Sequence, residues 1–464
     1  MIAYSGHPSY RFLCHPGGHF RFLLLCVVCW FGAASLRASE DHCLRLLPDH
    51  QEALQFRIDL IERAEREIDC SYYLVDTGRV SASILRLLID AAHRGVRVRL
   101  LIDGLMSRLP EPLHRILREN GVEIHAYRFP ESVHPRTLNQ RMHDKLLIVD
   151  RKHLILGSRN LRDNHFGIGD SPFLDCDLYI QGPVAAQAAA YYQWLWQHEQ
   201  VKPLSQANLL GRIVTTALPL RKDPWVPAFK TAKTDQQYLQ LLDRSYMFLI
   251  KHGFIGTRSI DTSRALSVAG NRVEFLAETD VAKSNFHVQK RLLNLIHQAQ
   301  QTILIQTPYP IFNERDLQAI YDARRRNVDV ILCTNSINSA DRAITSAGFE
   351  NIKDDLLSAG VKIYQLQSEP HLHTKAMVID GQIGVVSSYN FDERSAALNL
   401  EVGVIVQDAH FTESLLAVIH QQMAGARLAT VTTLLQPTAD AVESRRYWNV
   451  QFHRLLAPWI RPLL

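Results

Sequence analysis

The amino-acid sequence predicts an α/β protein of two similar domains, each a mixed β-sheet flanked by helices, packed with pseudo-twofold symmetry. Three observations support this prediction. At 464 residues the chain exceeds the size at which one hydrophobic core usually keeps growing. Its composition, 47% hydrophobic and 21% charged, is that of a globular protein. Helix-like and strand-like segments alternate, and the pattern returns after about 230 to 240 residues.

The first forty residues precede the repeated pattern. Arg11 and Arg21 come before an apolar run at 22–31, and small residues follow at 32–35, the order found in signal peptides. The run is shorter than the ~20 residues that a membrane-spanning helix needs. We therefore expect residues 1–38 to be a signal peptide or N-terminal targeting segment, cleaved after Ser35 or Ala38, with an N-terminal anchor as the alternative.

Four of the seven cysteines follow this segment: Cys43, Cys70, Cys176 and Cys333. They form no C-x-x-C pair, so a structural zinc site is not expected. Cys70 and Cys333 lie in apolar, strand-like stretches and are expected to be buried free thiols. A disulfide is the alternative in an exported protein.

Each half begins with a helix followed by a strand. Residues 56–68 and 292–303 are apolar at helical spacing, and the strand-like segments 70–75 and 304–309 follow them. Later helix-turn-strand units also correspond, 91–102 with 323–333 and 117–124 with 356–363. The repeat predicts a first domain over 40–200 and a second over 271–425, packed face to face.

The remaining segments have no counterpart in the repeat. Residues 201–270 contain several prolines and no strong strand signal, so they are predicted to connect the domains, with a helix at Asp235–Lys251. Residues 426–464 form a tail containing tryptophan, leucine and arginine, which either lies in a membrane interface or docks on the second domain.

One block of residues occurs in both halves with identical spacing. Lysine follows histidine by two residues, aspartate by seven, serine by fifteen and asparagine by seventeen. The first copy has His143, Lys145, Asp150, Ser158 and Asn160; the second has His373, Lys375, Asp380, Ser388 and Asn390. A single H-x-K is a common accident, but duplication at fixed spacing within a longer repeat indicates a functional site.

Strand geometry brings these side chains together. The residues between lysine and aspartate are apolar, which predicts a buried strand, and alternate residues of a strand share a face. Lys145 and Lys375, with Ser158, Ser388, Asn160 and Asn390, are predicted to bind the non-bridging oxygens of a phosphodiester without a metal or other cofactor. His143 and His373 are suited to nucleophilic attack and proton transfer.

The duplicated H-x-K-x4-D block, followed by G/S-S-x-N, closely resembles the defining motif of the phospholipase D superfamily. The resemblance implies that one histidine attacks phosphorus to give a phosphohistidine, while the other protonates the leaving alcohol and activates the incoming one. The resemblance to the family implies that His143 is the nucleophile and His373 the general acid/base, although the near symmetry leaves the reverse assignment open. The motif aspartates Asp150 and Asp380 end the strands, so a structural role is expected of them.

An orienting carboxylate is expected for each imidazole. By resemblance, Glu401 is the candidate in the second half and Asp175 its first-half counterpart, with Asp177 as an alternative. The second copy also has Ser387 where glycine is usual, and it continues into Asp392-Glu-Arg-Ser395, a tail that the first copy lacks. This asymmetry suggests that one half shapes the leaving or incoming group.

The substrate is predicted from the same resemblance, because residues 50–200 and 270–420 are most similar to bacterial cardiolipin synthases. It implies a glycerophospholipid substrate at a membrane surface, transfer of a phosphatidyl group or hydrolysis to phosphatidic acid, and a location at the periplasmic face or periphery of the inner membrane. No obligate protein partner is expected. A nuclease acting on nucleic acid is the main alternative, since the net charge of +4 does not discriminate between these ligands. A catalytically inactive lipid-binding relative is a second alternative, disfavoured because both motifs are intact.

Overall fold

The computed structural model describes residues 41–107, 109–128, 138–204, 226–256, 263–279, 286–341, 343–430 and 447–454. The predicted targeting segment at 1–38, its cleavage site and residues 455–464 of the tail lie outside the described residues. Among the helices that the structure describes, none is both long and apolar enough to cross a membrane.

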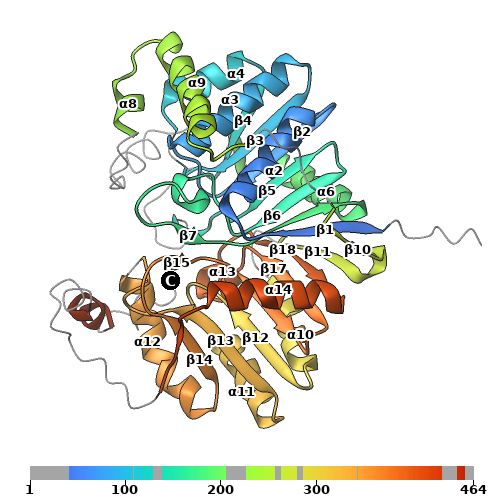
Figure 1. Ribbon diagram of the computed structural model, residues 1–464, viewed down its shortest axis with the longest axis vertical. Coiled ribbons are helices and arrows are strands. Elements are labelled where there is room, and N and C mark those ends of the chain that lie inside the picture. The colour runs from blue at the N-terminus through green and yellow to red at the C-terminus, as the bar shows by residue number, and fades with distance from the viewer. Residues whose placement is uncertain are drawn as a thin grey trace, which may run out of the picture. The chain divides into compact units, whose positions relative to one another are not determined.

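The first half is built on a nine-stranded mixed sheet, coloured blue to green with β10 in yellow (Figure 1). Strands β2, β3 and β4 are parallel, and their neighbours on both sides are antiparallel. In spatial order the strands are β10 (Leu266–Val268), β1 (His42–Leu47), β8 (Asp177–Gln181), β6 (His153–Gly157), β5 (Lys145–Val149), β2 (Glu67–Tyr72), β3 (Arg97–Asp103), β4 (Val122–Tyr127) and β9 (Val201–Pro203).

The second half repeats this sheet strand for strand, except that its described residues include no equivalent of β10. Its order is β11 (Val273–Ala277), β18 (Val402–Val406), β17 (Ile383–Ser387), β16 (Ala376–Ile379), β12 (Thr302–Gln306), β13 (Asp329–Asn335), β14 (Lys362–Leu366) and β19 (Arg427–Leu428). Here too the three strands β12, β13 and β14 are parallel and the others antiparallel. The predicted duplication and mixed α/β architecture are confirmed.

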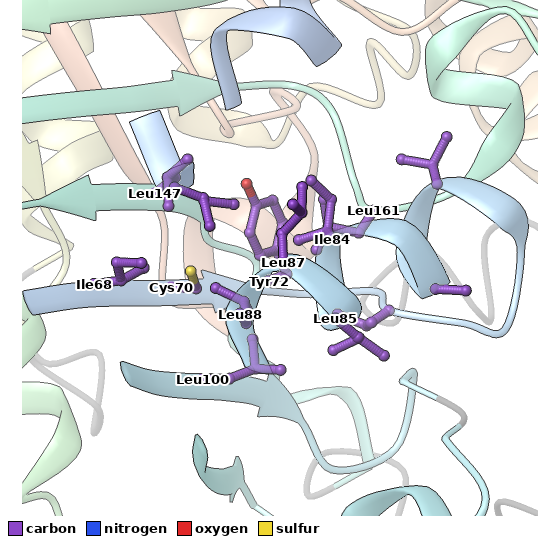
Figure 2. Close-up of a cluster of buried hydrophobic side chains, with 14 of the residues drawn as sticks. Ile68, Cys70, Tyr72, Ile84, Leu85, Leu87, Leu88, Leu100, Leu147 and Leu161 are labelled. Atoms are coloured by element: carbon purple, nitrogen blue, oxygen red, sulfur yellow. The ribbon is translucent and has the colours of Figure 1, made fainter. Parts of the chain in front are cut away.

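Helices cover the outer face of each sheet. In the first half these are α2 (His50–Arg63), α3 (Arg79–His93), α4 (Glu111–Glu119), α8 (Val226–Thr231) and α9 (Asp235–Lys251), and in the second α10 (His287–Gln298), α11 (Glu314–Arg325) and α12 (Ala343–Ser358). Each set encloses its own apolar core. Figure 2 shows the first of these, where side chains of β2, β3 and β5 meet those of α3; it labels Ile68, Cys70, Tyr72, Ile84, Leu85, Leu87, Leu88, Leu100, Leu147 and Leu161.

A third apolar core joins the halves. It contains side chains from β5, β6 and β8 of the first sheet, from β16, β17 and β18 of the second, and from α6 (Pro183–Trp196) and α14 (Ala409–Gln422). Two short strands also pair across the boundary, β7 (Phe173–Leu174) with β15 (His371–Leu372). Extensive apolar burial between the sheets is expected to hold the halves together as one body.

The segment at 201–270 differs in part from its prediction. Helix α9 has the predicted bounds and packs on α3. The segment also supplies the edge strands β9 and β10 to the first sheet, where no strong strand was expected. Each has three residues, too few to produce a detectable alternation of apolar and polar positions.

The described part of the tail docks on the second half. Strand β19 pairs with β14, and residues 447–454 form a helix whose Arg454 exchanges hydrogen bonds with Asn351 of α12. Val450 of this helix is buried against Ile337 and Ala347. Cys43, Cys70, Cys176 and Cys333 are free thiols, all buried except the half-buried Cys43.

Candidate active site

Both motif histidines lie where the two halves meet, immediately before β5 and β16. Each is only 6% exposed. Backbone hydrogen bonds tie each histidine to the other half: the His143 amide donates to the Leu400 carbonyl (2.9 Å), and the His373 amide donates to the Leu174 carbonyl (2.7 Å). The residues after Leu400 and Leu174 are therefore fixed beside the histidine of the opposite half.

The orienting carboxylates are exchanged between the halves. Nδ1 of His143 is 3.0 Å from Oε2 of Glu401, and Nδ1 of His373 is 2.8 Å from Oδ1 of Asp175. The sequence named one candidate carboxylate in each half, and both contact a motif imidazole, but each contacts the imidazole of the opposite half. The cross-domain backbone bonds cause the exchange.

Asp177, the alternative to Asp175, does not reach a motif histidine in the structure. Its carboxylate accepts hydrogen bonds from Arg57 (2.7 Å) and Arg159 (3.2 Å), and all three side chains are fully buried. Its other oxygen accepts the backbone amides of Ser158 and Arg159. Asp177 therefore holds the turn after β6 in place.

The motif serines support the carboxylates instead of facing a phosphate. The Ser158 hydroxyl donates to Asp175 at 2.6 Å, and the Ser388 hydroxyl donates to Glu401. Both side chains are fully buried. A hydroxyl has one proton to donate, so the predicted phosphate contact from Ser158 and Ser388 is corrected to a positioning role.

The two lysines are buried in equivalent positions. Nζ of Lys145 and Nζ of Lys375 each donate to the backbone carbonyl of the motif histidine two residues earlier, both at 2.6 Å. Burial lowers the pKa of Lys145 to about 8 and that of Lys375 to about 7, and the charge of Lys145 adds to the shift of Lys375. The effect of the Lys145 charge on the pKa of Lys375, and the effects of Glu401 and Asp175 on both lysines, indicate that both charges act on one site.

Asn160 and Asn390 have unmet hydrogen-bonding capacity. Their Oδ1 atoms are buried and have no hydrogen-bond partner within the part of the chain that the structure describes. Buried side-chain amides normally have partners, and exceptions are common where a ligand completes the network. The two asparagines remain predicted ligands of the substrate phosphate.

His165 belongs to the site and was missed from the sequence. Its Nδ1 is 2.7 Å from Oδ2 of Asp175, and its ring packs edge-on against that of His373, with centroids 4.9 Å apart. The second half has Ser395 at the matching position, so the repeat gave no signal for His165. Asp175 therefore orients two imidazoles, whereas Glu401 orients one.

These electrostatics keep the imidazoles neutral and the carboxylates ionised. Burial, aided by the lysines, lowers the pKa of His143 to about 4 and that of His373 well below its usual range. Burial raises the carboxylate pKa values, but contacts with the histidines outweigh it: the pKa of Glu401 falls to about 2, and that of Asp175 falls well below its ordinary value. A neutral imidazole that donates from Nδ1 presents a lone pair on Nε2.

His165, Asp175 and His373 also have atoms of the kind that bind metals, within 4.8 Å of one another. Both carboxylate oxygens of Asp175 already accept hydrogen bonds from the Nδ1 atoms of the two histidines. A metal there would displace both bonds and release His373, so we assign the cluster to imidazole orientation.

The motif aspartates contact backbone, not the site. Asp150 accepts hydrogen bonds from the amides of residues 65–67, and Asp380 from those of residues 300–302. In each half these amides connect the first helix to the first central strand. This is the arrangement expected of residues that order a turn.

These aspartates also explain a difference from the predicted helix boundaries. The pattern at 56–68 and 292–303 continues into residues that the structure assigns to the turn and to the start of β2 and β12. Because each aspartate binds three consecutive amides there, α2 ends at Arg63 and α10 at Gln298. The strands accordingly begin earlier than predicted.

In chemical terms, the site offers two neutral imidazoles and two buried ammonium groups. Nε2 of His143 and Nε2 of His373 have no hydrogen-bond partner among the residues described. One imidazole can attack phosphorus while the other transfers a proton, and the lysines can stabilise negative charge on the phosphoryl oxygens.

Comparison with known proteins identifies the same two halves. A family model described as "Cardiolipin synthase, PLD-like domain" matches residues 58–196 and 292–423. Cardiolipin synthase C of Escherichia coli (strain K12) is 26% identical over 390 residues, which cover 77% of this chain and 79% of the relative. Cardiolipin synthase A of Edwardsiella ictaluri (strain 93-146) is 25% identical over 406 residues, covering 86% and 72%.

A solved structure supports the fold. The crystal structure of phosphatidylserine synthase from Haemophilus influenzae Rd KW20 aligns with a TM-score of 0.63 at 14% identity, covering 93% of this chain and 99% of that one. The family model covers more than half of the chain, with one match in each half. The chain belongs to the phospholipase D superfamily, in the branch that the cardiolipin synthase model describes, and is a phosphatidyltransferase or phosphodiesterase of the phospholipase D type.

Proposed function

We propose that the protein is a metal-independent, cardiolipin synthase-like phosphatidyltransferase that acts on phospholipids through a phosphohistidine intermediate. Water acts as a competing acceptor and gives phosphatidic acid. The observation that carries the proposal is the pair of buried histidines, each oriented through Nδ1 by a carboxylate of the opposite half. The similarity to cardiolipin synthases A and C supports phospholipid as the substrate.

In the proposed first step, Nε2 of His143 attacks phosphorus. Entry of the anionic phosphate adds negative charge beside His373, which favours binding of a proton at its Nε2. The N–P bond then forms as the bond to the leaving alcohol breaks, and His373 gives this proton to the departing oxygen. The two lysines and the two asparagines bind the non-bridging oxygens, on which negative charge is held.

In the second step the acceptor alcohol gives its proton to His373 and its oxygen attacks phosphorus. The N–P bond breaks, which restores neutral His143 and protonated His373. Ionised Glu401 and Asp175 stabilise the imidazolium form of whichever histidine carries the proton. The near symmetry of the site also allows the two histidines to exchange these roles.

A substrate assay tests the proposal. The full chain is incubated with phosphatidylglycerol vesicles and, separately, with single-stranded and duplex DNA, all in EDTA. We expect cardiolipin and phosphatidic acid from the vesicles and no cleavage of DNA. Cleavage of DNA without any lipid product would establish the nuclease alternative, and no turnover of either substrate would support an inactive lipid-binding relative.

A trapping experiment tests the intermediate. Wild-type protein, His143→Ala and His373→Ala are mixed with phospholipid carrying a labelled phosphate and quenched in alkali, where phosphohistidine survives. We expect an acid-labile label on His373→Ala and none on His143→Ala. The opposite pattern would exchange the roles of the histidines, and the absence of label from every protein during turnover would refute the covalent mechanism.

We also propose that the protein is exported and works at the periplasmic face or periphery of the inner membrane. The apolar run at 22–31 and the exposed aromatic side chains of Trp448 and Phe452, each 61% exposed on the helix at 447–454, support this location. Protease treatment of spheroplasts should digest the protein if it faces the periplasm. Protection from protease until the membrane is dissolved would contradict the proposal.

A further inference from the structure

Arg394 of the second half reaches the first half beside His143. Its Nη2 lies 3.5 Å from the hydroxyl of Tyr73, the residue that follows β2. The Tyr73 ring packs edge-on against His143, with centroids 4.7 Å apart, and Nζ of Lys145 lies 5.3 Å from the same ring. The side chain of Tyr73 thus contacts both the guanidinium of Arg394 and the catalytic histidine.

The charge of Arg394 is poorly compensated. No carboxylate lies within ion-pair distance of it in the described chain, and its contact with Tyr73 is at the outer limit of a hydrogen bond. Its Nε is buried and has no partner among the same residues. Burial raises the pKa of Asp392, two residues before Arg394, to about 7, which weakens the counter-charge that this carboxyl supplies. Leaving a buried donor unpaired is costly, so this guanidinium is suited to binding an anionic ligand.

The first half has no arginine at the position that matches Arg394. Arg394 follows Asn390 by four residues, where the first half has Asn164. The nearby Arg162, two residues after Asn160, is neutralised, since its Nε donates to Asp76 at 2.8 Å. The lysines and asparagines occur in both halves and suit the phosphoryl group that lies between them. Arg394 is a poorly compensated cation in one half only, so it is suited to a part of the substrate that extends from the reacting phosphoryl group toward that residue.

We propose that Arg394 and Tyr73 form a subsite for a second phosphate, the one carried by the acceptor alcohol, next to the phosphodiester that reacts. A guanidinium binds phosphate oxygens through paired N–H groups, and the Tyr73 hydroxyl supplies a further donor. In a glycerophospholipid acceptor, only a glycerol unit separates the reacting hydroxyl from this phosphate. The subsite rests on the proposed function and makes the acceptor itself an anionic lipid.

Acceptor kinetics test the subsite. The full chain receives labelled phosphatidylglycerol as donor, with glycerophosphoglycerol or glycerol as soluble acceptor, and transfer is measured against hydrolysis. We expect Arg394→Gln to raise the KM for glycerophosphoglycerol about 10- to 100-fold, the effect of losing a charged hydrogen bond, and to change the KM for glycerol far less. Arg394→Lys should recover part of the loss, and Arg162→Gln, which removes a neutralised arginine of the first half, serves as the control and should leave both KM values as in wild type.

Two results would overturn the subsite. One is an equal effect of Arg394→Gln on glycerol, glycerophosphoglycerol and water, which would place Arg394 at the reacting phosphate. The other is an unchanged KM for glycerophosphoglycerol. If Arg394→Gln does not fold, Tyr73→Phe provides the test, with an expected rise of about 3- to 10-fold for the loss of a neutral donor and retention of the ring.

Direct binding separates failure of the subsite from failure of the proposed function. Calorimetry with glycerophosphoglycerol needs no turnover, so it applies even if the wild type transfers no lipid. Weaker binding by Arg394→Gln than by wild type supports the subsite whatever the reaction is. Equal binding by the two proteins refutes the subsite even if cardiolipin is formed.

Discussion

Glu401 of the second half accepts the Nδ1 proton of His143 in the first half, across 3.0 Å. Asp175 and His373 form the reciprocal pair at 2.8 Å. Neither half therefore contains a complete site, since each supplies an imidazole and the carboxylate that orients the other imidazole. Separation of the halves would expose both histidines and leave them without orientation.

The exchanged pairing predicts cross-domain effects of substitution. In nitrogen-15 NMR, Glu401→Gln should change the Nδ1 resonance of His143, and Asp175→Asn should change those of His373 and His165. Each substitution should lower the rate on the order of 10³- to 10⁴-fold, as found where an orienting carboxylate beside a catalytic histidine is neutralised. A Glu401→Gln spectrum in which only His373 shifts would refute the pairing.

The lowered pKa values of the lysines predict an alkaline loss of activity. Lys375, with a pKa of about 7, and Lys145, with a pKa of about 8, are charged below these values and lose their protons as the pH rises. Since the charged form binds the anionic phosphate, kcat/KM should fall as the pH rises through 7 to 8. A pH profile at constant ionic strength measures this, and a profile that stays level to pH 9 would contradict it.

The motif aspartates predict a loss of stability. Asp150→Ala and Asp380→Ala each remove a carboxylate that binds three backbone amides, and each should lower the free energy of unfolding by about 1–3 kcal/mol. Urea unfolding measures the change, with the exposed Asp354→Ala on α12 as control, expected within about 0.5 kcal/mol of wild type.

The pH dependence of that stabilisation has a defined sign. Burial raises the pKa of Asp150, but the three backbone amides outweigh it and the net pKa is lowered. The contribution of Asp150 should therefore be fully present above the unfolded pKa near 4 and disappear as the pH falls through the lower folded pKa. If wild type and Asp150→Ala differ equally at pH 7 and well below the folded pKa, this assignment fails.

Asp177 and Asp175 should respond differently to the same substitution. Asp177→Asn removes the only carboxylate of a fully buried group with Arg57 and Arg159, so we expect a loss of about 3–5 kcal/mol in unfolding free energy. Asp175→Asn should reduce turnover in a protein that still folds. Thermal unfolding and activity measured together distinguish them, and a stable but inactive Asp177→Asn would reverse the two roles.

Ser387 stands where the first half has Gly157, and the residue that pairs with this position on the next strand also differs between the halves. Gly157 pairs with Asp177 in the first half, whereas Ser387 pairs with Gly403 in the second. A Cβ on Gly403 would lie 2.7 Å from Cβ of Ser387. We expect Gly403→Ala to lower the melting temperature and Ser387→Gly to restore part of the loss in the double variant; additive destabilisation would show that the two positions do not compensate.

Local sequence pattern determined the fold class and the central side chains of the site. The repeat, the alternation of helices and strands and the motif spacing depend on neighbouring residues, and they identified His143, His373 and both lysines. The same pattern placed α9 correctly, because a 17-residue helix carries a periodic signal that a three-residue edge strand does not.

Tertiary structure decided the relationships between the halves. The partner of each histidine, the packing of His165 against His373 and the position of Arg394 beside Tyr73 depend on which segments meet across the boundary. The role of Ser158 and Ser388 depends on contacts within each half that are distant in sequence. The ends of α2 and α10 likewise depend on Asp150 and Asp380, about 80 residues away in sequence. A linear pattern records only what recurs along the chain, whereas these contacts join residues through the packing of two sheets, and their hydrogen bonds exist only once that packing has formed.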